Sequence, residues 1–201
     1  WQSQFILLAS ERGLSSPRKT GTEMSPRQSI ELSNDWNVSF QGLENLRTNL
    51  VMKTLTDWTT FQGLENFSGT AVYETEFELR SAINNRQSAI FLDLGEVHEV
   101  ASIKVNGQEV GNVWMQPYRL DISKQIKPGR NRLEIRVANL LWNYAAGLKE
   151  PKPIPEDLQA HYGTTWNQKY NGWNSLQEIK KHRDKRLPSG LIGPVRLLIW
   201  N

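Results

Sequence analysis

The chain has 201 residues, a mass of 23.1 kDa and a formal net charge of +3. This length suits one well-buried domain, and a nearly balanced charge gives no electrostatic reason to expect nucleic acid as a partner. The absence of cysteine excludes disulfides and thiol chemistry, and no apolar run is long enough to cross a membrane as a helix.

Residues 1–28 are predicted to lie outside the main domain. Residues 4–9 form a short apolar run, which is either a strand of this domain or the last strand of a preceding one. The following residues, to position 28, have the Ser, Arg, Thr, Gly and Pro content of a linker. We therefore expect one domain over residues 29–201. The chain starts at Trp1 without a signal pattern, which indicates a piece of a longer protein.

The first part of this domain, from Ser29, contains an alternating apolar series between Ile30 and Phe40 that is interrupted at Asn34. This pattern predicts two short strand pieces with a turn or bulge between them. The hexapeptide Phe-Gln-Gly-Leu-Glu-Asn occurs at residues 40–45 and again at residues 61–66. One duplication this short is not a repeat architecture, and we interpret it as two similar strand ends.

The stretch from Phe67 to Trp142 is predicted to organise the fold. Apolar residues alternate with polar ones over residues 71–79 and again over residues 132–138, which is typical of strands with one buried face. Asn106-Gly107 lies between two such runs and predicts a tight hairpin. Short turns between alternating runs favour an antiparallel β-sandwich.

Residues 143–187 contain no alternating run and are predicted to form a long insertion before a closing strand at residues 195–200. We expect short helical turns after Pro155 and from Ser175, where Ser175 and Glu178 fit a capping box. A connection of this length inside a compact domain is often functional.

Several motifs in this order resemble a known family. They are Gly69-x-Ala71-x-Tyr73, Leu92-x-Leu94-Gly95, Val105-Asn106-Gly107, Tyr118-x-x-Asp121-Ile122, Pro128-Gly129-x-Asn131 and residues 188–197. The chain resembles the jelly-roll sugar-binding domain of family 2 glycoside hydrolases, and most of all the related C-terminal domain of family 106-type α-L-rhamnosidases. The resemblance implies an all-β, galactose-binding-like jelly-roll sandwich with a long loop and short-helix insertion before the last strand.

The resemblance also implies a function, which we state as an expectation. The domain would be a non-catalytic accessory part of a glycoside hydrolase that packs against the catalytic module of the same parent chain and contacts a polysaccharide or oligosaccharide. A secreted, periplasmic or cell-surface location follows from the resemblance alone. A purely structural docking domain and a glycosidase in its own right are the alternatives.

Aromatic and amide side chains suit the apolar faces and hydroxyl groups of sugars. Two groups of candidate carbohydrate-binding residues follow. The first lies at hairpin and strand ends, where loops of a sandwich gather, and the second lies in the insertion: Trp114, Tyr118, Trp142 and Asn143, and then Tyr162, Trp166, Tyr170 and Trp173. The alternative is that some of these rings only hold the insertion onto the sandwich.

The sequence nominates no catalytic machinery. It contains no nucleophile elbow, phosphate loop or dinucleotide fingerprint. No pair of carboxylates stands out as a glycosidase acid and nucleophile, and the three histidines show no metal-ligand spacing. We expect no cofactor, although a structural calcium ion stays open because jelly-roll carbohydrate modules often hold one. The basic run at residues 180–186 is interpreted as a solvated helix end.

Overall fold

A computed structural model describes residues 26–79, 89–148, 181 and 185–200. Nearly all regular structure in these residues is β. The strands are β1 (Gln28–Glu31), β2 (Trp36–Gly42), β3 (Arg47–Met52), β4 (Gly69–Leu79), β5 (Ala89–Asp93), β6 (Glu96–His98), β7 (Val100–Val105), β8 (Gln108–Val113), β9 (Arg119–Asp121), β10 (Gly129–Ala138), β11 (Gly190–Gly193) and β12 (Arg196–Trp200). The helices are two 3-10 turns, Leu43–Asn45 and Trp58–Thr60, and α1 (Trp142–Gly147).

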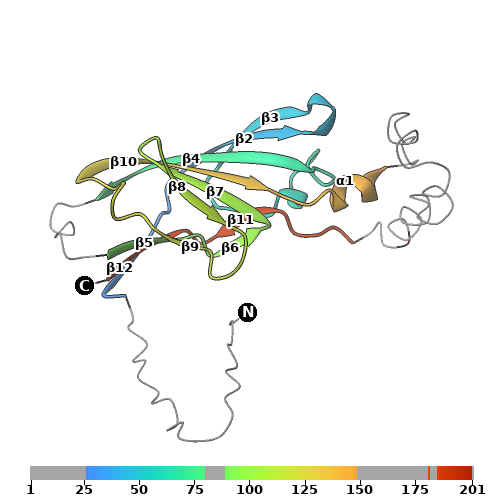
Figure 1. Cartoon of the computed structure of the whole chain (residues 1–201). Coiled ribbons are helices and arrows are strands. Elements are labelled where there is room, and N and C mark those ends of the chain that lie inside the picture. Colours follow the sequence, from blue (N-terminus) through green and yellow to red (C-terminus); the bar gives the residue numbers. More distant parts are fainter. Residues whose placement is uncertain (1–25, 80–88, 149–180, 182–184, 201) are drawn as a thin grey trace, which may run out of the picture.

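The strands form two stacked layers (Figure 1). One layer is a six-stranded sheet in the order β3-β2-β4-β10-β7-β8, and the other is a four-stranded sheet in the order β1-β12-β5-β9. A small third pairing joins β11 to β6. Every pairing among the described strands is antiparallel. The predicted all-β sandwich is confirmed.

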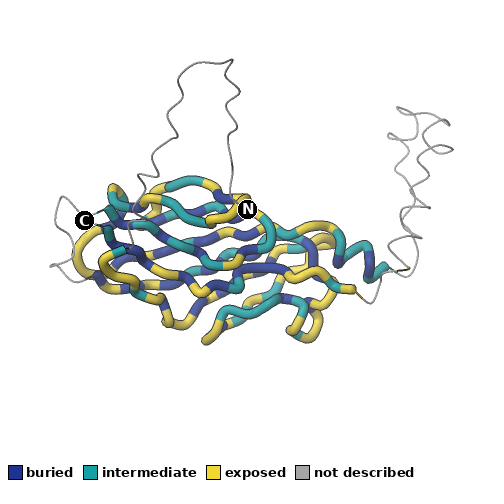
Figure 2. The backbone as a smooth tube through the Cα atoms, turned by 90° about the horizontal axis from the view of Figure 1, so that it is seen from below, coloured by how far each residue is buried: buried dark blue, intermediate teal, exposed yellow. Residues whose placement is uncertain are grey.

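The long central strands β4 and β10 show why the sequence folds this way. In β4 the side chains of Ala71, Tyr73 and Phe77 are buried, while Glu76 and Glu78 are exposed. Strand β10 pairs with β4 along ten positions and alternates in the same manner. Figure 2 shows this alternation of buried and exposed positions along the strands. Because successive side chains of a strand point to opposite faces, one face of the six-stranded sheet lines the core and the other meets water.

The predicted hairpin at Asn106-Gly107 is confirmed and joins β7 to β8. Asn106 has φ 53° and Gly107 has φ 80°, the left-handed values that such a two-residue turn requires. The Asn106 side chain also donates to the Gln125 carbonyl at 2.8 Å and to Asn131 Oδ1 at 2.8 Å. The turn is therefore tied to the β9–β10 connection as well as to its own strands.

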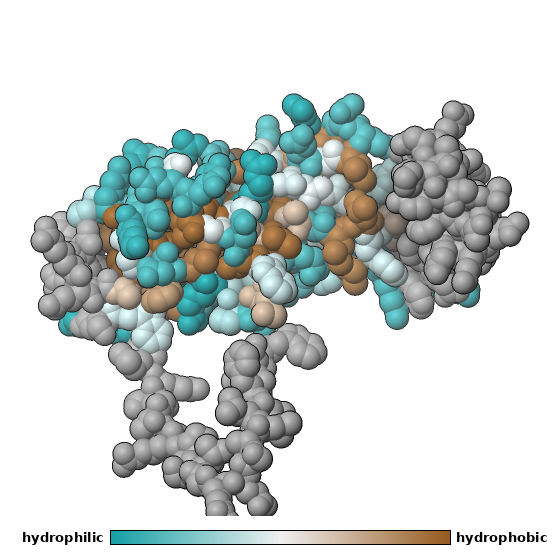
Figure 3. Space-filling view, in the orientation of Figure 1, coloured by the Kyte–Doolittle hydropathy of each residue, from teal (hydrophilic) through white to brown (hydrophobic). Residues whose placement is uncertain are grey.

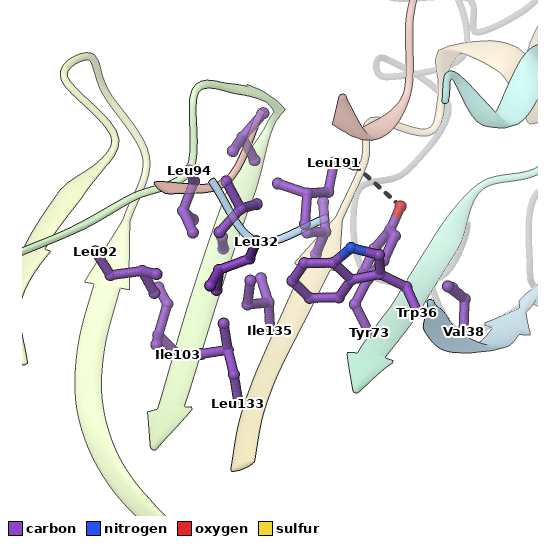
Figure 4. Close-up of a cluster of buried hydrophobic side chains, with 14 of the residues drawn as sticks. Leu32, Trp36, Val38, Tyr73, Leu92, Leu94, Ile103, Leu133, Ile135 and Leu191 are labelled. Atoms are coloured by element: carbon purple, nitrogen blue, oxygen red, sulfur yellow. Dashed lines mark hydrogen bonds between the residues drawn. The ribbon is translucent and has the colours of Figure 1, made fainter. Parts of the chain in front are cut away.

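The Tyr73 hydroxyl is a buried polar group in the core between the layers. It accepts a hydrogen bond from the Trp58 indole nitrogen. It accepts a second one, at 3.0 Å, from the Leu191 backbone N–H (Figure 4). Burial raises the pKa of Tyr73 to about 12. Phe40, Trp58 and Phe67 pack edge to face beside it, with ring centroids 5.2 to 5.4 Å apart. The tyrosine thus joins the central strand β4 to the C-terminal segment.

Three details differ from the sequence-based picture. The two strand pieces before and after Asn34 belong to different sheets, because β1 pairs with β12 and β2 pairs with β3 and β4. The second copy of the hexapeptide, at residues 61–66, forms turns and not a strand end. The helix α1 at Trp142–Gly147 was not predicted, since it is too short to show a helical period. The expected helical turns after Pro155 and from Ser175 begin outside the described residues.

Candidate functional site

Several loops gather at the end of the six-stranded sheet that lies beside α1, which we call the α1 end (Figure 1). Strands β2 and β10 finish there and β4 and β7 begin there. The register shows this directly, because Gly42 pairs with Gly69, and Ala138 pairs with both Thr70 and Val100. Strand β8 also ends here, since Val113 is the last residue of its ladder with β7. The connections before and after these strands therefore meet at one end of the sandwich.

Asn143, a predicted sugar contact, is buried in the protein and fully engaged. It is 1% exposed, and its amide nitrogen donates to the Leu187 carbonyl at 2.8 Å and to Ser189 Oγ at 3.1 Å. Its amide oxygen accepts from the Leu187 backbone N–H at 2.9 Å. Both amide hydrogens are used, and at 1% exposure the amide oxygen is not accessible to a sugar. In the structure Asn143 fastens the segment before β11 to α1.

Asn139 extends the same arrangement, although it is not one of the predicted sugar contacts. Its amide nitrogen donates to the Phe67 carbonyl at 2.9 Å and to Ser189 Oγ at 3.0 Å, and its oxygen accepts from the Gly69 N–H at 2.9 Å. We call Asn139, Asn143 and Ser189 the asparagine cluster. The signal that could have found it is the spacing of the two asparagines, which places one at the end of β10 and the other in the first turn of α1.

Trp142, another predicted sugar contact, is also hydrogen-bonded within the fold. Its indole nitrogen donates to the Lys185 carbonyl at 3.0 Å, and the residue is half-buried. This bond and those of Asn143 hold the chain at residues 185–189 against α1. The helix and the returning segment therefore form one hydrogen-bonded unit.

Trp114, in contrast, is open to solvent. It follows the last residue of β8 and is 68% exposed, and the next residue, Met115, is 48% exposed. Val113 before it is buried and pairs with Ala101 of β7. The ring therefore stands on the solvent side of the sheet at the α1 end, where a flat apolar surface is available to a ligand.

Tyr118 lies in the connection from β8 to β9 and packs partly against the core. Its backbone carbonyl accepts from the Leu94 N–H at 2.9 Å. Desolvation raises the pKa of the Tyr118 hydroxyl, and the negative charges of Glu99 and Glu96 raise it further. The phenol is therefore a neutral group in a locally acidic surrounding.

Four exposed leucines form an apolar border at the α1 end. Leu43 and Leu46 are 43% and 39% exposed, and Leu140 and Leu141 are 51% and 63% exposed. Ser68 links the two pairs, because its carbonyl accepts from the Leu43 N–H at 3.4 Å and its hydroxyl donates to the Leu140 carbonyl at 2.8 Å. We call these four residues the leucine rim. Figure 3 shows hydrophobic residues reaching the surface in this part of the molecule.

The solvent face of the six-stranded sheet becomes more charged with distance from the α1 end. Arg132 pairs with Glu74, and Arg130 pairs with Glu76. The Lys104 ammonium lies 3.8 Å from Glu134 and 4.0 Å from Glu109. Most of these charges are partnered across neighbouring strands, which is an ordinary way to solvate an exposed sheet face.

Glu74 and Glu134 deserve comparison with a glycosidase pair, because they lie directly opposite each other on β4 and β10. A glycosidase needs one carboxyl group in a shielded environment that keeps it protonated. Here each carboxylate is engaged with a cation, Arg132 and Lys104 respectively.

In the described part of the chain, no group of three or more His, Asp or Glu side chains could hold a metal ion, and no helix is long and apolar enough to cross a membrane.

The remaining predicted contacts, Tyr162, Trp166, Tyr170 and Trp173, lie outside the described residues and stay predictions. The proposed boundary between residues 28 and 29 also stays a prediction.

The fold and this loop-rich end define a class of protein: a galactose-binding-like β-sandwich of the kind found in glycoside hydrolases. Residues 59–175 match the family described as "Glycosyl hydrolase 2 galactose-binding domain-like". This match spans more than half of the chain, and the protein belongs to that family. The resemblance noted from the sequence is confirmed.

Individual relatives support the same assignment. A "Putative beta-glucuronidase" of Formosa agariphila is 30% identical over 210 residues. The solved structure of a rhamnosidase from Novosphingobium sp. PP1Y is 30% identical, with a TM-score of 0.62 over 88% of this chain. A β-glucuronidase from Ruminococcus gnavus, solved with uronic isofagomine, is 24% identical with a TM-score of 0.50 and shares the fold.

These relatives are much longer than this chain. The chain spans 18% of the Formosa agariphila protein and 16% of the solved rhamnosidase chain. It therefore corresponds to one domain of such multidomain proteins.

Proposed function

We propose that this chain is a non-catalytic accessory domain of an exported glycoside hydrolase and that it packs against the catalytic module through the leucine rim. The observation that carries the proposal is the gathering of exposed leucines at one end of the sandwich. The names of the relatives, a β-glucuronidase and a rhamnosidase, support a parent enzyme that cleaves glycosides.

The leucine rim has the properties of a surface that is covered in a larger protein. Leu140 and Leu141 are adjacent in sequence and both more than half exposed, next to the half-exposed Leu43. A hollow of about 270 Å³ lies in the same border, and its lining includes Leu43, Leu46 and Tyr144. Contiguous apolar surface of this kind marks interaction sites in soluble proteins. The relatives provide a natural occupant, because more than four fifths of their length lies outside the part matched here.

The docking surface can be tested with two matched substitutions. Leu141 and Val51 are both 63% exposed, but Leu141 belongs to the leucine rim and Val51 lies on the edge strand β3. We expect Leu141→Asp to abolish binding between this chain and the separately produced remainder of the parent protein, measured by analytical ultracentrifugation. Val51→Asp should leave the complex intact. Equal effects of the two substitutions, or a stable complex with Leu141→Asp, would show that the leucine rim is not the interface.

The non-catalytic part of the proposal has its own test. The isolated 201-residue chain should release no product from aryl β-glucuronides or aryl α-rhamnosides, while the parent protein hydrolyses one of them. Turnover by the isolated chain that Glu74→Gln and Glu134→Gln abolish would make this domain a glycosidase, since these two carboxylates face each other across strands.

A second candidate function, contact with glycan, is favoured by Trp114. It is the most exposed of the large apolar side chains in the described residues, and its ring offers a platform for the C–H face of a sugar. Docking through the leucine rim and glycan contact at Trp114 use different residues and are compatible in one domain.

A further inference from the structure

We infer that Trp114, Asn112, Ser102 and Arg136 form a saccharide subsite on the solvent face of the six-stranded sheet, and that this subsite takes a sugar unit bearing a carboxylate, a uronate. The inference rests on the glycan-contact part of the proposed function. It adds the residues that do the binding and the class of sugar.

The register of three neighbouring strands brings three polar side chains side by side. Asn112 on β8 pairs with Ser102 on β7, and Ser102 pairs with Arg136 on β10. Residues that pair in an antiparallel sheet lie on the same face. The chain neighbours of these three residues toward the α1 end, Val113, Ala101 and Val137, are buried. The amide, the hydroxyl and the guanidinium therefore project together into solvent.

Trp114 lies close to Asn112 along the chain. It follows Asn112 by two residues, directly after Val113, the last residue of β8, and two residues of extended chain span about 7 Å. At 68% exposure most of the ring surface is uncovered. A single sugar ring that stacks on Trp114 can therefore place its substituents over Asn112 and Ser102.

The surface is hollowed beside these side chains. A hollow of about 350 Å³ is lined by Ser102, Ile103, Lys104, Glu109, Gly111, Asn112, Glu134 and Arg136. This volume falls in the range of small-molecule clefts, roughly 300 to 1,000 Å³. The irregular register between β7 and β8 at Ile103 and Lys104 lies within it.

The positive charge of Arg136 is available to a ligand. On β10, Arg130 and Arg132 each have a carboxylate partner, whereas Arg136 has no ion pair with any described residue. The two nearby carboxylates, Glu134 and Glu109, both lie within 4.0 Å of the Lys104 ammonium. A guanidinium presents two parallel N–H donors that match a carboxylate. Arg136 is thus the cation in this hollow that is available to a uronate.

The row that contains Arg136 supports this assignment. Across the sheet it runs through six residues, of which Arg136 is the only charged one: Asn49, Ser39, Val72, Arg136, Ser102 and Asn112. A carboxylate placed over Arg136 meets the Ser102 hydroxyl and then the Asn112 amide on one side and the apolar Val72 on the other. The row contains no acidic side chain.

The test is calorimetric titration of the 201-residue chain with three tetrasaccharides of different charge. Tetragalacturonate carries carboxylates, cellotetraose is neutral, and a sulfated galactan tetrasaccharide carries sulfates. We expect tetragalacturonate to bind most tightly. Arg136→Gln should weaken this binding about tenfold or more, since it removes a charge-assisted hydrogen bond. Arg130→Gln is the matched control, because it removes the same charge from the far end of the same strand, and should change nothing.

The stacking platform is tested in the same titration. Trp114→Ala should weaken tetragalacturonate binding about fivefold or more, and Trp114→Phe should retain most of it, because a flat ring remains. Equal affinity for cellotetraose, or binding of the sulfated tetrasaccharide alone, would overturn the uronate assignment. Equal losses in Arg136→Gln and Arg130→Gln would reduce the effect to general surface charge. No binding of any tetrasaccharide would remove the subsite, while the docking test with Leu141→Asp would stand unaffected.

Discussion

Two tryptophans at the same end of the sandwich have opposite surroundings. Trp142 is half-buried and donates its indole N–H to the Lys185 carbonyl at 3.0 Å, whereas Trp114 is 68% exposed at the end of β8. The asparagines show the same contrast, because Asn143 is 1% exposed and Asn112 lies on the solvent face. Residue type alone therefore does not separate a side chain that is hydrogen-bonded within the fold from one that is exposed to solvent. The difference is contact with residues 185–189, which are hydrogen-bonded to Trp142 and Asn143.

The largest expected effect comes from breaking the asparagine cluster. Asn143→Ala removes three hydrogen bonds and leaves the Leu187 N–H without its partner, while the Leu187 carbonyl keeps only the Ser189 hydroxyl at 3.3 Å. We expect the free energy of unfolding, measured by urea denaturation, to fall by about 3 kcal/mol. Asn112→Ala is the matched control on the exposed side and should change it by less than about 0.5 kcal/mol. A loss below about 1 kcal/mol for Asn143→Ala would show that the cluster does not hold the returning segment.

The second largest effect is expected from removing the Tyr73 hydroxyl and its two hydrogen bonds. Tyr73→Phe removes the acceptor for the Trp58 indole N–H and the Leu191 backbone N–H, both buried. We expect the free energy of unfolding at pH 7 to fall by about 2 kcal/mol. Intact urea stability in this variant would mean that the two donors find other acceptors.

Tyr73 also predicts a dependence on pH. Its pKa is about 12 in the folded protein against 10.0 for an ordinary tyrosine, so the unfolded chain loses this proton first. The stability that the neutral phenol contributes is present below pH 10 and is lost as the pH rises from 10 to 12. This amounts to about 3 kcal/mol. The difference in stability between wild type and Tyr73→Phe should shrink or reverse over this window, and a constant difference would contradict the raised pKa.

A smaller effect is expected from Trp142→Phe. It keeps the ring and removes one hydrogen bond to the Lys185 carbonyl, so the free energy of unfolding should fall by about 1 kcal/mol. Amide exchange near residues 185–189 should also accelerate. Unchanged stability and unchanged exchange would place Trp142 with the exposed residues and weaken the contrast.

The smallest effect on stability is expected from Trp114→Ala, within about 0.5 kcal/mol of wild type, because the ring is mostly solvated already. Thermal unfolding by circular dichroism is sufficient to measure this. A loss of several kcal/mol would show that Trp114 is part of the core packing and not a free surface.

The sequence was sufficient for most of the sandwich because the strands have strong local signals. The alternation in β4 and the Asn106-Gly107 turn predicted a buried face and a hairpin, and both are present. The partner of β1 was not visible in the same way. It pairs with β12, more than 160 residues away, and no local pattern specifies such a contact.

The candidate site was harder to predict because exposure depends on tertiary contacts. Trp114 and Trp142 both lie at the end of a strand-rich stretch, and the sequence analysis treated them alike. What separates them is the segment at residues 185–189, which reaches Trp142 and Asn143 through backbone groups. The alternation over residues 132–138 predicts only that Arg136 faces outward. Its cross-strand neighbours, Val72 and Ser102, carry no charge, and this is visible only from the register of the strands.

The most direct test of the account is hydroxyl-radical footprinting of this chain alone and within the longer parent protein that we propose. Leu140 and Leu141 should be labelled in the isolated chain and protected in the parent, while Val51 is labelled equally in both. Trp114 should stay labelled in the parent and become protected when tetragalacturonate is added. Equal labelling of the two leucines in both proteins would contradict docking through the leucine rim.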